Sequence, residues 1–261
     1  MILIAILMGT LAAGIGSVWL AALLSFGVLA RYTQHMLSLA AGALLATAFM
    51  HLLPEAFESQ ASAHDLFMTL LVGLIFFFLL DKAELWHHGH EHHHHHQESP
   101  LESDHAHSHG AKVGSWAVLT GDSVHCFGDG VLIASAFMAD MRLGVIASLA
   151  VLAHEVPHHM GDLMVLRTGT NNKQTALLKV SLAGAVTALG GLVGYWLVDQ
   201  LQGYLPYFLV VASSSFVYVA LADLIPQLQK RLTARETAAQ IIWLMVGISL
   251  VMAVGRLAHS H

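Results

Sequence analysis

Eight mainly apolar stretches, separated by short polar breaks, recur along this chain of 261 residues. Each is long enough to cross roughly 30 Å of hydrocarbon as a helix of about 20 residues, whereas membrane-spanning strands would be shorter and alternate in polarity. Because 56% of the residues are hydrophobic and only 11% are charged, a water-soluble globule would lack enough polar residues to cover its surface. We therefore predict an all-α integral membrane protein, a bundle of eight transmembrane helices. The predicted spans are Leu3–Leu24, Met36–Leu53, Leu66–Leu80, Gly114–Met138, Leu143–Leu166, Thr175–Val198, Pro206–Leu224 and Ile241–Arg256.

The predicted spans divide the chain into three parts. Residues 1–85 hold the first three helices, residues 86–112 form a histidine-rich loop, and residues 113–261 hold the last five helices. The first span is apolar from Met1 onward and leads into a second span after Arg31. We therefore interpret it as a retained helix and not as a cleaved signal peptide.

Lysine and arginine near the ends of spans favour the cytoplasmic side of a membrane. If the N-terminus is external, only Arg142 and Arg256 lie on the external side, and the other nine of the 11 basic residues lie on the cytoplasmic side. We therefore expect both termini to be external and the histidine-rich loop to be cytoplasmic. The expected location of this multi-pass protein is a cell membrane, the inner membrane if the source is bacterial.

Two of the spans contain ionisable side chains, which are costly to bury in hydrocarbon and usually mark a site or pathway inside a bundle. The fourth predicted span reads T-G-D-S-V-H-C-F-G-D-G, so His125 and Asp129 share a helix face. The fifth reads A-H-E-V-P-H-H-M-G-D, so His154 and His158 share a face beside Glu155. Imidazoles and carboxylates from two facing helices suit a borderline-soft divalent cation. We predict that these five residues form a metal site near the bilayer midplane.

The same two spans carry four further residues of ligand type. Asp122 and Cys126 lie in the fourth span, and His159 and Asp162 lie in the fifth. We assign them as auxiliary metal ligands or pathway residues. A thiol ligand at Cys126, the single cysteine, would favour zinc or cadmium over manganese.

Two other spans carry ionisable residues nearer to their ends. The sequence F-M-H-L-L-P-E-A places His51 and Glu55 one turn apart at the external end of the second span. They are either a first station for an incoming ion or an interfacial cap. Asp223, in A-L-A-D-L-I-P-Q of the seventh span, lies near the cytoplasmic end, where it is either part of an exit relay or a structural anchor.

The loop between the third and fourth spans reads W-H-H-G-H-E-H-H-H-H-H-Q and then D-H-A-H-S-H. It has no apolar periodicity, so we expect it to be disordered. Its neutral imidazoles would collect or sense metal on the cytoplasmic side. An expression tag is the alternative, but the tract is internal and continues irregularly on both sides.

These segments together resemble the ZIP (Zrt/Irt-like) family of metal transporters, and more closely its LIV-1-like branch. The family pattern H-N-x-x-D-G is matched in the fourth span by His125, Asp129 and Gly130. The pattern H-E-x-P-H-E-x-G-D is matched in the fifth span by His154, Glu155, Pro157, His158, Gly161 and Asp162. The H-L-L-P-E and F-V-Y-V-A-L-A-D-L-I-P segments of the second and seventh spans are also similar, so the resemblance covers most of the chain.

The resemblance implies an eight-helix carrier, often a homodimer, that moves divalent metal into the cytoplasm. Zinc is the expected transported substrate, with cadmium, iron and manganese as alternatives. The expected partners are divalent ions, the lipid bilayer and a second copy of the chain, and no nucleic acid is expected.

Two departures from the family pattern bear on the number of metal sites. Cys126 stands where the family usually has asparagine, and His159 where it usually has glutamate. Some relatives hold a second metal with that asparagine and a glutamate in the sixth span, where this chain has Thr187. We therefore expect a single transport site.

Other functions remain to be weighed against a carrier. His154-Glu155-x-x-His158 is an H-E-x-x-H motif, which in metalloproteases binds zinc through both histidines and uses the glutamate as general base. An intramembrane protease is therefore one alternative, although Pro157 inside the motif and the matching ligands of the fourth span favour a transporter and not an enzyme. A metal exporter, a metal sensor and a channel are further alternatives that the sequence leaves open.

Overall fold

The computed structural model describes residues 1–25, 33–89, 110–169, 173–228 and 233–259. Among these residues the regular structure is helical and there is no strand. Every predicted span falls within a helix, so the eight-helix bundle is confirmed. Of the predicted histidine-rich loop, residues 86–112, positions 90–109 lie outside the described residues, whereas 86–89 end one helix and 110–112 begin the next, so the expected loop is too long at both ends.

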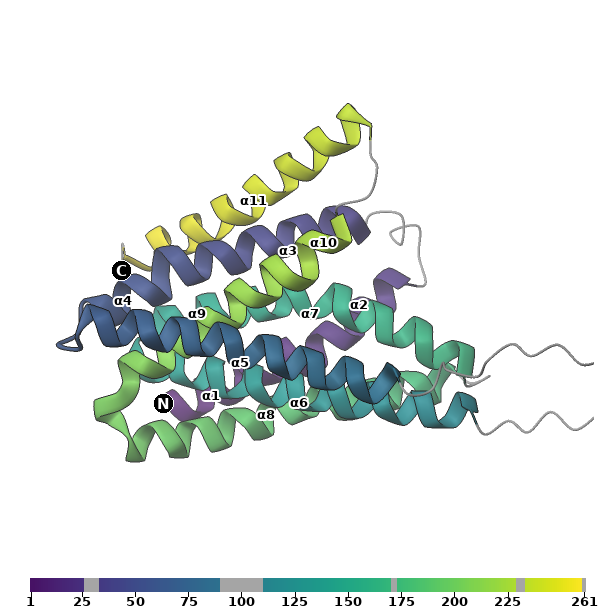
Figure 1. Ribbon diagram of the computed structural model, residues 1–261, viewed down its shortest axis with the longest axis horizontal. Helices are drawn as coiled ribbons and strands as arrows, with labels where there is room; N and C mark the ends of the chain where they lie inside the picture. Colours follow the sequence, from purple (N-terminus) through teal and green to yellow (C-terminus); the bar gives the residue numbers. More distant parts are fainter. Residues whose placement is uncertain (26–32, 90–109, 170–172, 229–232, 260–261) are drawn as a thin grey trace, which may run out of the picture.

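The membrane-spanning helices are longer than the predicted spans. In chain order they are α1 Ile2–Leu11 continuing into α2 Ser17–Ser25, α3 Thr33–Thr47 into α4 Leu53–Phe57, α5 Ala63–Gly89, α6 Gly110–Ala139, α7 Met141–Gly169, α8 Lys173–Gln200, α9 Leu205–Tyr218 into α10 Ile225–Leu228, and α11 Ala234–His259. A short 3₁₀ turn, Gln202–Tyr204, joins α8 to α9. Both ends of the chain lie at the same end of the bundle (Figure 1), as an even number of crossings requires.

Three of the spans contain a π-helical segment where two α-helical parts meet. These segments are Ala12–Gly16 between α1 and α2, Ala48–Leu52 before α4, and Val219–Leu224 after α9. A π-segment widens one turn of a helix and is frequent at functional sites. The first π-segment directly precedes Ser17, whose hydroxyl contacts His159 of α7.

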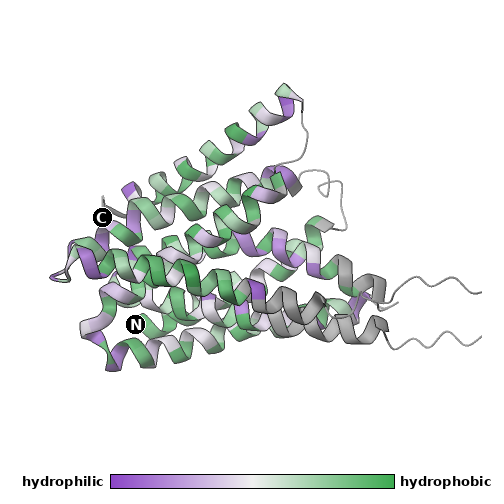
Figure 2. Ribbon diagram, viewed as in Figure 1, coloured by the Kyte–Doolittle hydropathy of each residue, from purple (hydrophilic) through white to green (hydrophobic). Residues whose placement is uncertain are grey.

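Six of the eight spans are long and apolar enough to cross a membrane by composition alone, judged on the described residues. The helices α6 and α7 are not among them, because their ionisable side chains lower the local hydropathy. These two helices lie within the bundle (Figure 1), where α6 packs on α7 and α8 and α7 packs on α3. Hydrophobic residues predominate along most of the other ribbons in Figure 2.

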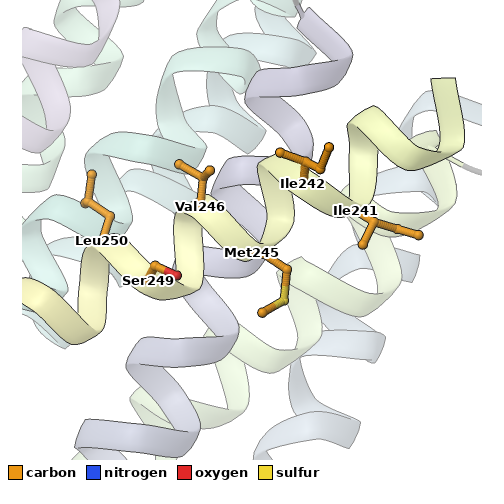
Figure 3. A pocket seen from close by; sticks show the side chains of 6 residues that line it. All are labelled: Ile241, Ile242, Met245, Val246, Ser249 and Leu250. Carbon is orange, nitrogen blue, oxygen red and sulfur yellow. The ribbon is translucent and has the colours of Figure 1, made fainter. Parts of the chain in front are cut away.

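The outer helix α11 exposes large hydrophobic side chains on the perimeter of the bundle. It packs mainly on α3, and its outer side carries an open apolar groove (Figure 3). The groove is lined by Ile241, Ile242, Met245, Val246, Ser249 and Leu250. In a bilayer such a surface faces lipid chains, so it needs no protein cover to be stable.

The close contact of α6 with α8 depends on small residues. A Cβ atom on Gly130 of α6 would overlap the backbone carbonyl oxygen of Thr187, and one on Gly190 of α8 would overlap that of Phe127. Small residues allow such approach in membranes, where packing and not water exclusion holds helices together. By contrast, a Cβ on Gly128 would meet no heavy atom within 4 Å.

We predict that Gly130→Ala destabilises the bundle by about 1–3 kcal/mol, because added atoms in a packed interface force the backbones apart. Thermal unfolding of the purified protein in detergent would show a lower midpoint. Gly128→Ala on the same helix is the matched control and should leave the midpoint nearly unchanged. Equal midpoints for the two variants would contradict this account of the α6–α8 contact.

Candidate metal centre

The candidate site is built on the facing surfaces of α6 and α7, which are joined only by Asp140. Its carboxylate accepts a hydrogen bond of 2.7 Å from the backbone N–H of Arg142 and so caps the start of α7. The chain reverses here, so residues that come earlier in α6 face residues that come later in α7. The ionisable side chains of the two helices therefore meet in successive layers.

The first layer contains four of the five predicted ligands. It comprises His125, Asp129, His154 and Glu155, whose ligand atoms lie within 4.8 Å of one another. Nε2 of His154 lies 3.1 Å from Oδ2 of Asp129 and 3.2 Å from Oε1 of Glu155. Nε2 of His125 lies 3.1 Å from the same oxygen of Glu155 and 3.4 Å from Nε2 of His154.

These separations match the edges of a tetrahedron around zinc. Bonds of 2.0–2.2 Å from zinc to nitrogen or oxygen place tetrahedral ligand atoms about 3.3–3.5 Å apart. Five of the six separations among the four ligand atoms run from 3.1 Å to 3.9 Å, and the sixth, between Asp129 and Glu155, is within 4.8 Å. The first layer therefore has the donor set and the spacing that a divalent ion requires.

The orientation of His154 is set by its own helix. Its Nδ1 lies 3.3 Å from the backbone carbonyl oxygen of Ala150, which can only accept a hydrogen bond. A neutral His154 therefore carries its proton on Nδ1 and directs the Nε2 lone pair at Asp129 and Glu155. A lone pair facing two carboxylates is unfavourable unless a metal cation lies between them or the ring is protonated and donates to them, and the three side chains are 98–99% buried.

The second layer contains residues assigned from the sequence as auxiliary. Asp122, Cys126, Glu155 and His159 again bring one ligand atom each to within 4.8 Å of one another, and all four are buried. Glu155 belongs to both layers, since its Oε1 faces the first and its Oε2 lies 3.1 Å from Nε2 of His159. The buried core of the bundle thus contains two donor sets that share one carboxylate.

The third layer contains Asp122, His158 and Asp162. Nδ1 of His158 lies 3.3 Å from Asp162 and 3.7 Å from Asp122. The structure therefore does not bring His158 into the four-residue group that holds His154, although its ring stacks on that of His125 at 5.4 Å. The two histidines of the H-E-x-x-H motif face different donor sets.

The remaining predicted residues lie apart from these layers. His51 packs against Gly255 of α11, Glu55 is exposed on α4, and neither belongs to a donor group among the described residues. Asp223 lies in the π-segment after α9, but its side chain is outside the described part of the chain.

One residue of the site was not predicted from the sequence. Ser17, fully buried at the start of α2, places its hydroxyl oxygen 3.0 Å from Nδ1 of His159. A serine in an apolar first span gives no signal of such a role, because its partner lies 142 residues away in the sequence.

Comparison with known proteins identifies the family. The sequence profile described as "ZIP Zinc transporter" matches residues 82–255, which is most of the chain and includes all three layers. The chain belongs to the ZIP zinc transporter family. It is accordingly a multi-pass integral membrane protein that transports divalent metal.

Three individual members of the ZIP family show how far the similarity extends. The zinc transporter ZIP13 of Pongo abelii is 27% identical over an alignment 273 positions long, which covers 94% of this chain and 76% of that protein. The zinc transporter ZIP4 of Homo sapiens is 34% identical over 137 residues, 52% of this chain and 20% of that protein. The zinc transporter foi of Drosophila melanogaster is 30% identical over 177 residues, 67% of this chain and 24% of that protein. The chain therefore spans only a quarter or less of the last two.

We predict that Asp129→Asn raises the half-saturating zinc concentration for uptake by more than about tenfold. Even the loss of a hydrogen-bond partner of a metal ligand lowers metal affinity by about tenfold or more, and Asp129 is predicted to be a ligand itself. Uptake into proteoliposomes at a series of zinc concentrations would measure it. Asp140→Asn makes the same chemical change at the end of α6, where asparagine can still cap α7, and should leave uptake unchanged. Similar half-saturation for both variants would remove Asp129 from the ion's path.

Proposed function

We propose that this ZIP family member carries zinc into the cytoplasm, with the first layer as its transport site. The observation that carries the proposal is the near-tetrahedral spacing of four donor atoms, three from the buried residues Asp129, His154 and Glu155 and one from the half-buried His125. The names of the relatives, all zinc transporters, support zinc as the substrate. Cadmium, iron and manganese are secondary candidates for the same oxygen and nitrogen ligands.

The depth of the first layer suits a carrier that exposes one site to each side in turn. His154 lies about 20 Å along the helix axis from either end of α7, close to the middle of the membrane. The charge distribution along the sequence supports external termini, with the later part of α7 toward the cytoplasm. An ion leaving the first layer in that direction passes the second layer and then meets His158 and Asp162.

Exposure supports that direction of exit. In the first layer the side chain of His154 is 2% exposed and that of His125 is 26% exposed, whereas in the third layer those of Asp162 and His158 are 13% and 36% exposed. We infer that the third layer receives the ion as it leaves the buried site, and that Asp122 links the third layer to the second. We further propose that the ion contacts three residues nearer the two membrane surfaces, namely His51, Glu55 and Asp223.

A carrier fits the geometry better than an intramembrane protease. A zinc-dependent peptidase requires both histidines of H-E-x-x-H on one ion and a free glutamate as base. Here His154 and His158 face different donor sets, and Glu155 lies between two layers of ligand atoms. A homodimer, which the family resemblance implies, is part of the proposal and is tested by the mass of the purified protein.

We predict that His154→Ala abolishes zinc uptake into proteoliposomes, since it removes the ligand whose orientation is fixed by Ala150. His64→Ala is the control, because His64 is 82% exposed near the start of α5 and belongs to none of the layers. Accumulation of zinc by intact cells, compared with everted vesicles, tests the direction. Normal uptake by His154→Ala would overturn the proposed transport site.

We predict that uptake weakens as the pH falls below about 6, because protons and metal ions compete for the ring nitrogens of histidine. Initial rates of zinc uptake, measured across this range with equal pH on both sides of the membrane, would show the decline. A higher zinc concentration should partly restore the rate if the effect is competition. A flat profile would argue against neutral imidazoles as ligands of the transported ion.

A further inference from the structure

The second layer has the geometry of a metal site in its own right. Sγ of Cys126 lies 3.6 Å from Oδ1 of Asp122, 3.7 Å from Oε2 of Glu155 and 4.0 Å from Nε2 of His159. Bonds of 2.3 Å from zinc to sulfur and 2.0–2.1 Å to nitrogen or oxygen give tetrahedral separations of about 3.5 Å between sulfur and its neighbours. The observed separations from sulfur are slightly longer, and that between His159 and Glu155, 3.1 Å, is slightly shorter than a tetrahedral edge.

A hydrogen bond from outside the two helices fixes the orientation of His159. The hydroxyl of Ser17 donates its only hydrogen to the backbone carbonyl oxygen of Gly14, at 2.5 Å. Its oxygen therefore accepts a hydrogen bond from Nδ1–H of His159, 3.0 Å away. A neutral His159 held in this way presents the lone pair of Nε2 to Asp122, Cys126 and Glu155.

The position of Ser17 follows from the π-segment before it. A Cβ on Gly14 would overlap the carbonyl oxygen of Gly184 and lie 2.7 Å from the hydroxyl of Thr187, so α8 meets the backbone of the first span directly. This contact lies one turn before Ser17 and holds its hydroxyl against α7. Outer partners of this kind set the tautomer and direction of a ligating histidine.

A second observation indicates that the layer takes a cation. Asp122 and Glu155 are 2% and 1% exposed, and Oδ2 of Asp122 has no hydrogen-bond partner among the described residues. Two buried carboxylates beside an imidazole lone pair leave strong negative potential uncompensated. The competing explanation is that His159 is an imidazolium ion paired with both carboxylates, which would need no metal.

The departures of this chain from its family pattern fit together at this layer. Thr187 stands where some relatives have a glutamate ligand, and it lies within hydrogen-bonding reach of the Cys126 thiol. The asparagine and the glutamate that those relatives have at positions 126 and 187 are absent here. The thiol of Cys126, His159 and Asp122 supply ligand atoms in their place. From the sequence we expected a single site, because we took the loss of those two ligands to leave no second set of metal ligands.

We propose that Asp122, Cys126, Glu155 and His159 form a second, thiolate-containing site for a soft divalent cation, and that Ser17 is its positioning residue. The inference rests on the proposed function only in taking a divalent ion as ligand. Binding would displace the thiol proton of Cys126 to solvent. The site would favour zinc and cadmium over manganese, because thiolate is a soft ligand.

Cadmium titration of the purified full-length protein tests this proposal. A cadmium–thiolate bond gives a charge-transfer absorption in the ultraviolet that cadmium bound to imidazole or carboxylate does not give. Because Cys126 is the single cysteine, this absorption reports on the second layer alone, however much cadmium other histidines bind. The band is expected in the wild type and absent in Cys126→Ser, while Asp129→Asn, which damages only the first layer, retains it.

Ser17→Ala should raise the cadmium concentration at half-maximal absorption by about tenfold or more, as loss of an outer hydrogen bond to a ligating histidine typically does. Ser135→Ala is the matched control, since Ser135 is equally buried and bonds only to Val131 of its own helix in the described structure. An unchanged titration of Ser17→Ala would overturn the positioning role. A folded wild type without the thiolate band would overturn the second site and favour the imidazolium pair, whatever the uptake by His154→Ala shows.

Discussion

The structure depends on the cost of placing ionisable side chains inside a membrane. A carboxylate or imidazole in hydrocarbon is stable only if other polar groups or a cation surround it. In this chain the ionisable residues of α6 and α7 satisfy that requirement by facing one another. Because the two helices are antiparallel and joined by a single residue, each polar group meets a partner at the same depth. The other helices then enclose these facing polar residues of α6 and α7, the polar seam, with apolar and small residues.

The enclosure explains why two kinds of surface occur in one bundle. Between α6 and α8, glycines bring backbones into direct contact, and Gly14 brings the first span onto α8 in the same way. On the perimeter, α11 exposes large apolar side chains that suit lipid. The close contacts fix the distances among helices, and through Ser17 they also fix the direction of a side chain in the seam.

Much of the fold could be predicted from the sequence, because a span of about 20 apolar residues is a strong local signal. The ligand-type residues were also identifiable, since His125 and Asp129 share a helix face and cannot be exposed to lipid at low cost. The division of His154 and His158 between donor sets could not be predicted. Both project from one face of α7, and only the rotamers and the facing residues of α6 decide which neighbours each one meets.

Contacts between residues far apart in the sequence could not be predicted for a related reason. Nothing in the periodicity of the first span indicates that Ser17 faces α7, since a serine there is equally compatible with bonding its own helix. The π-segment that precedes it also has no clear sequence signature. Such details depend on how eight helices pack, whereas the spans themselves depend only on local composition.

The sharing of carboxylates between layers bears on how an ion can be bound and still released. Glu155 serves the first and second layers, and Asp122 serves the second and third. An ion that moves along the seam can therefore exchange ligands one at a time and need not lose all of them at once. A second ion in an adjacent layer would draw on the same carboxylate and repel the first, because unscreened charges interact strongly in a buried site. Both effects lower the barrier to release without removing the ligands that select the metal.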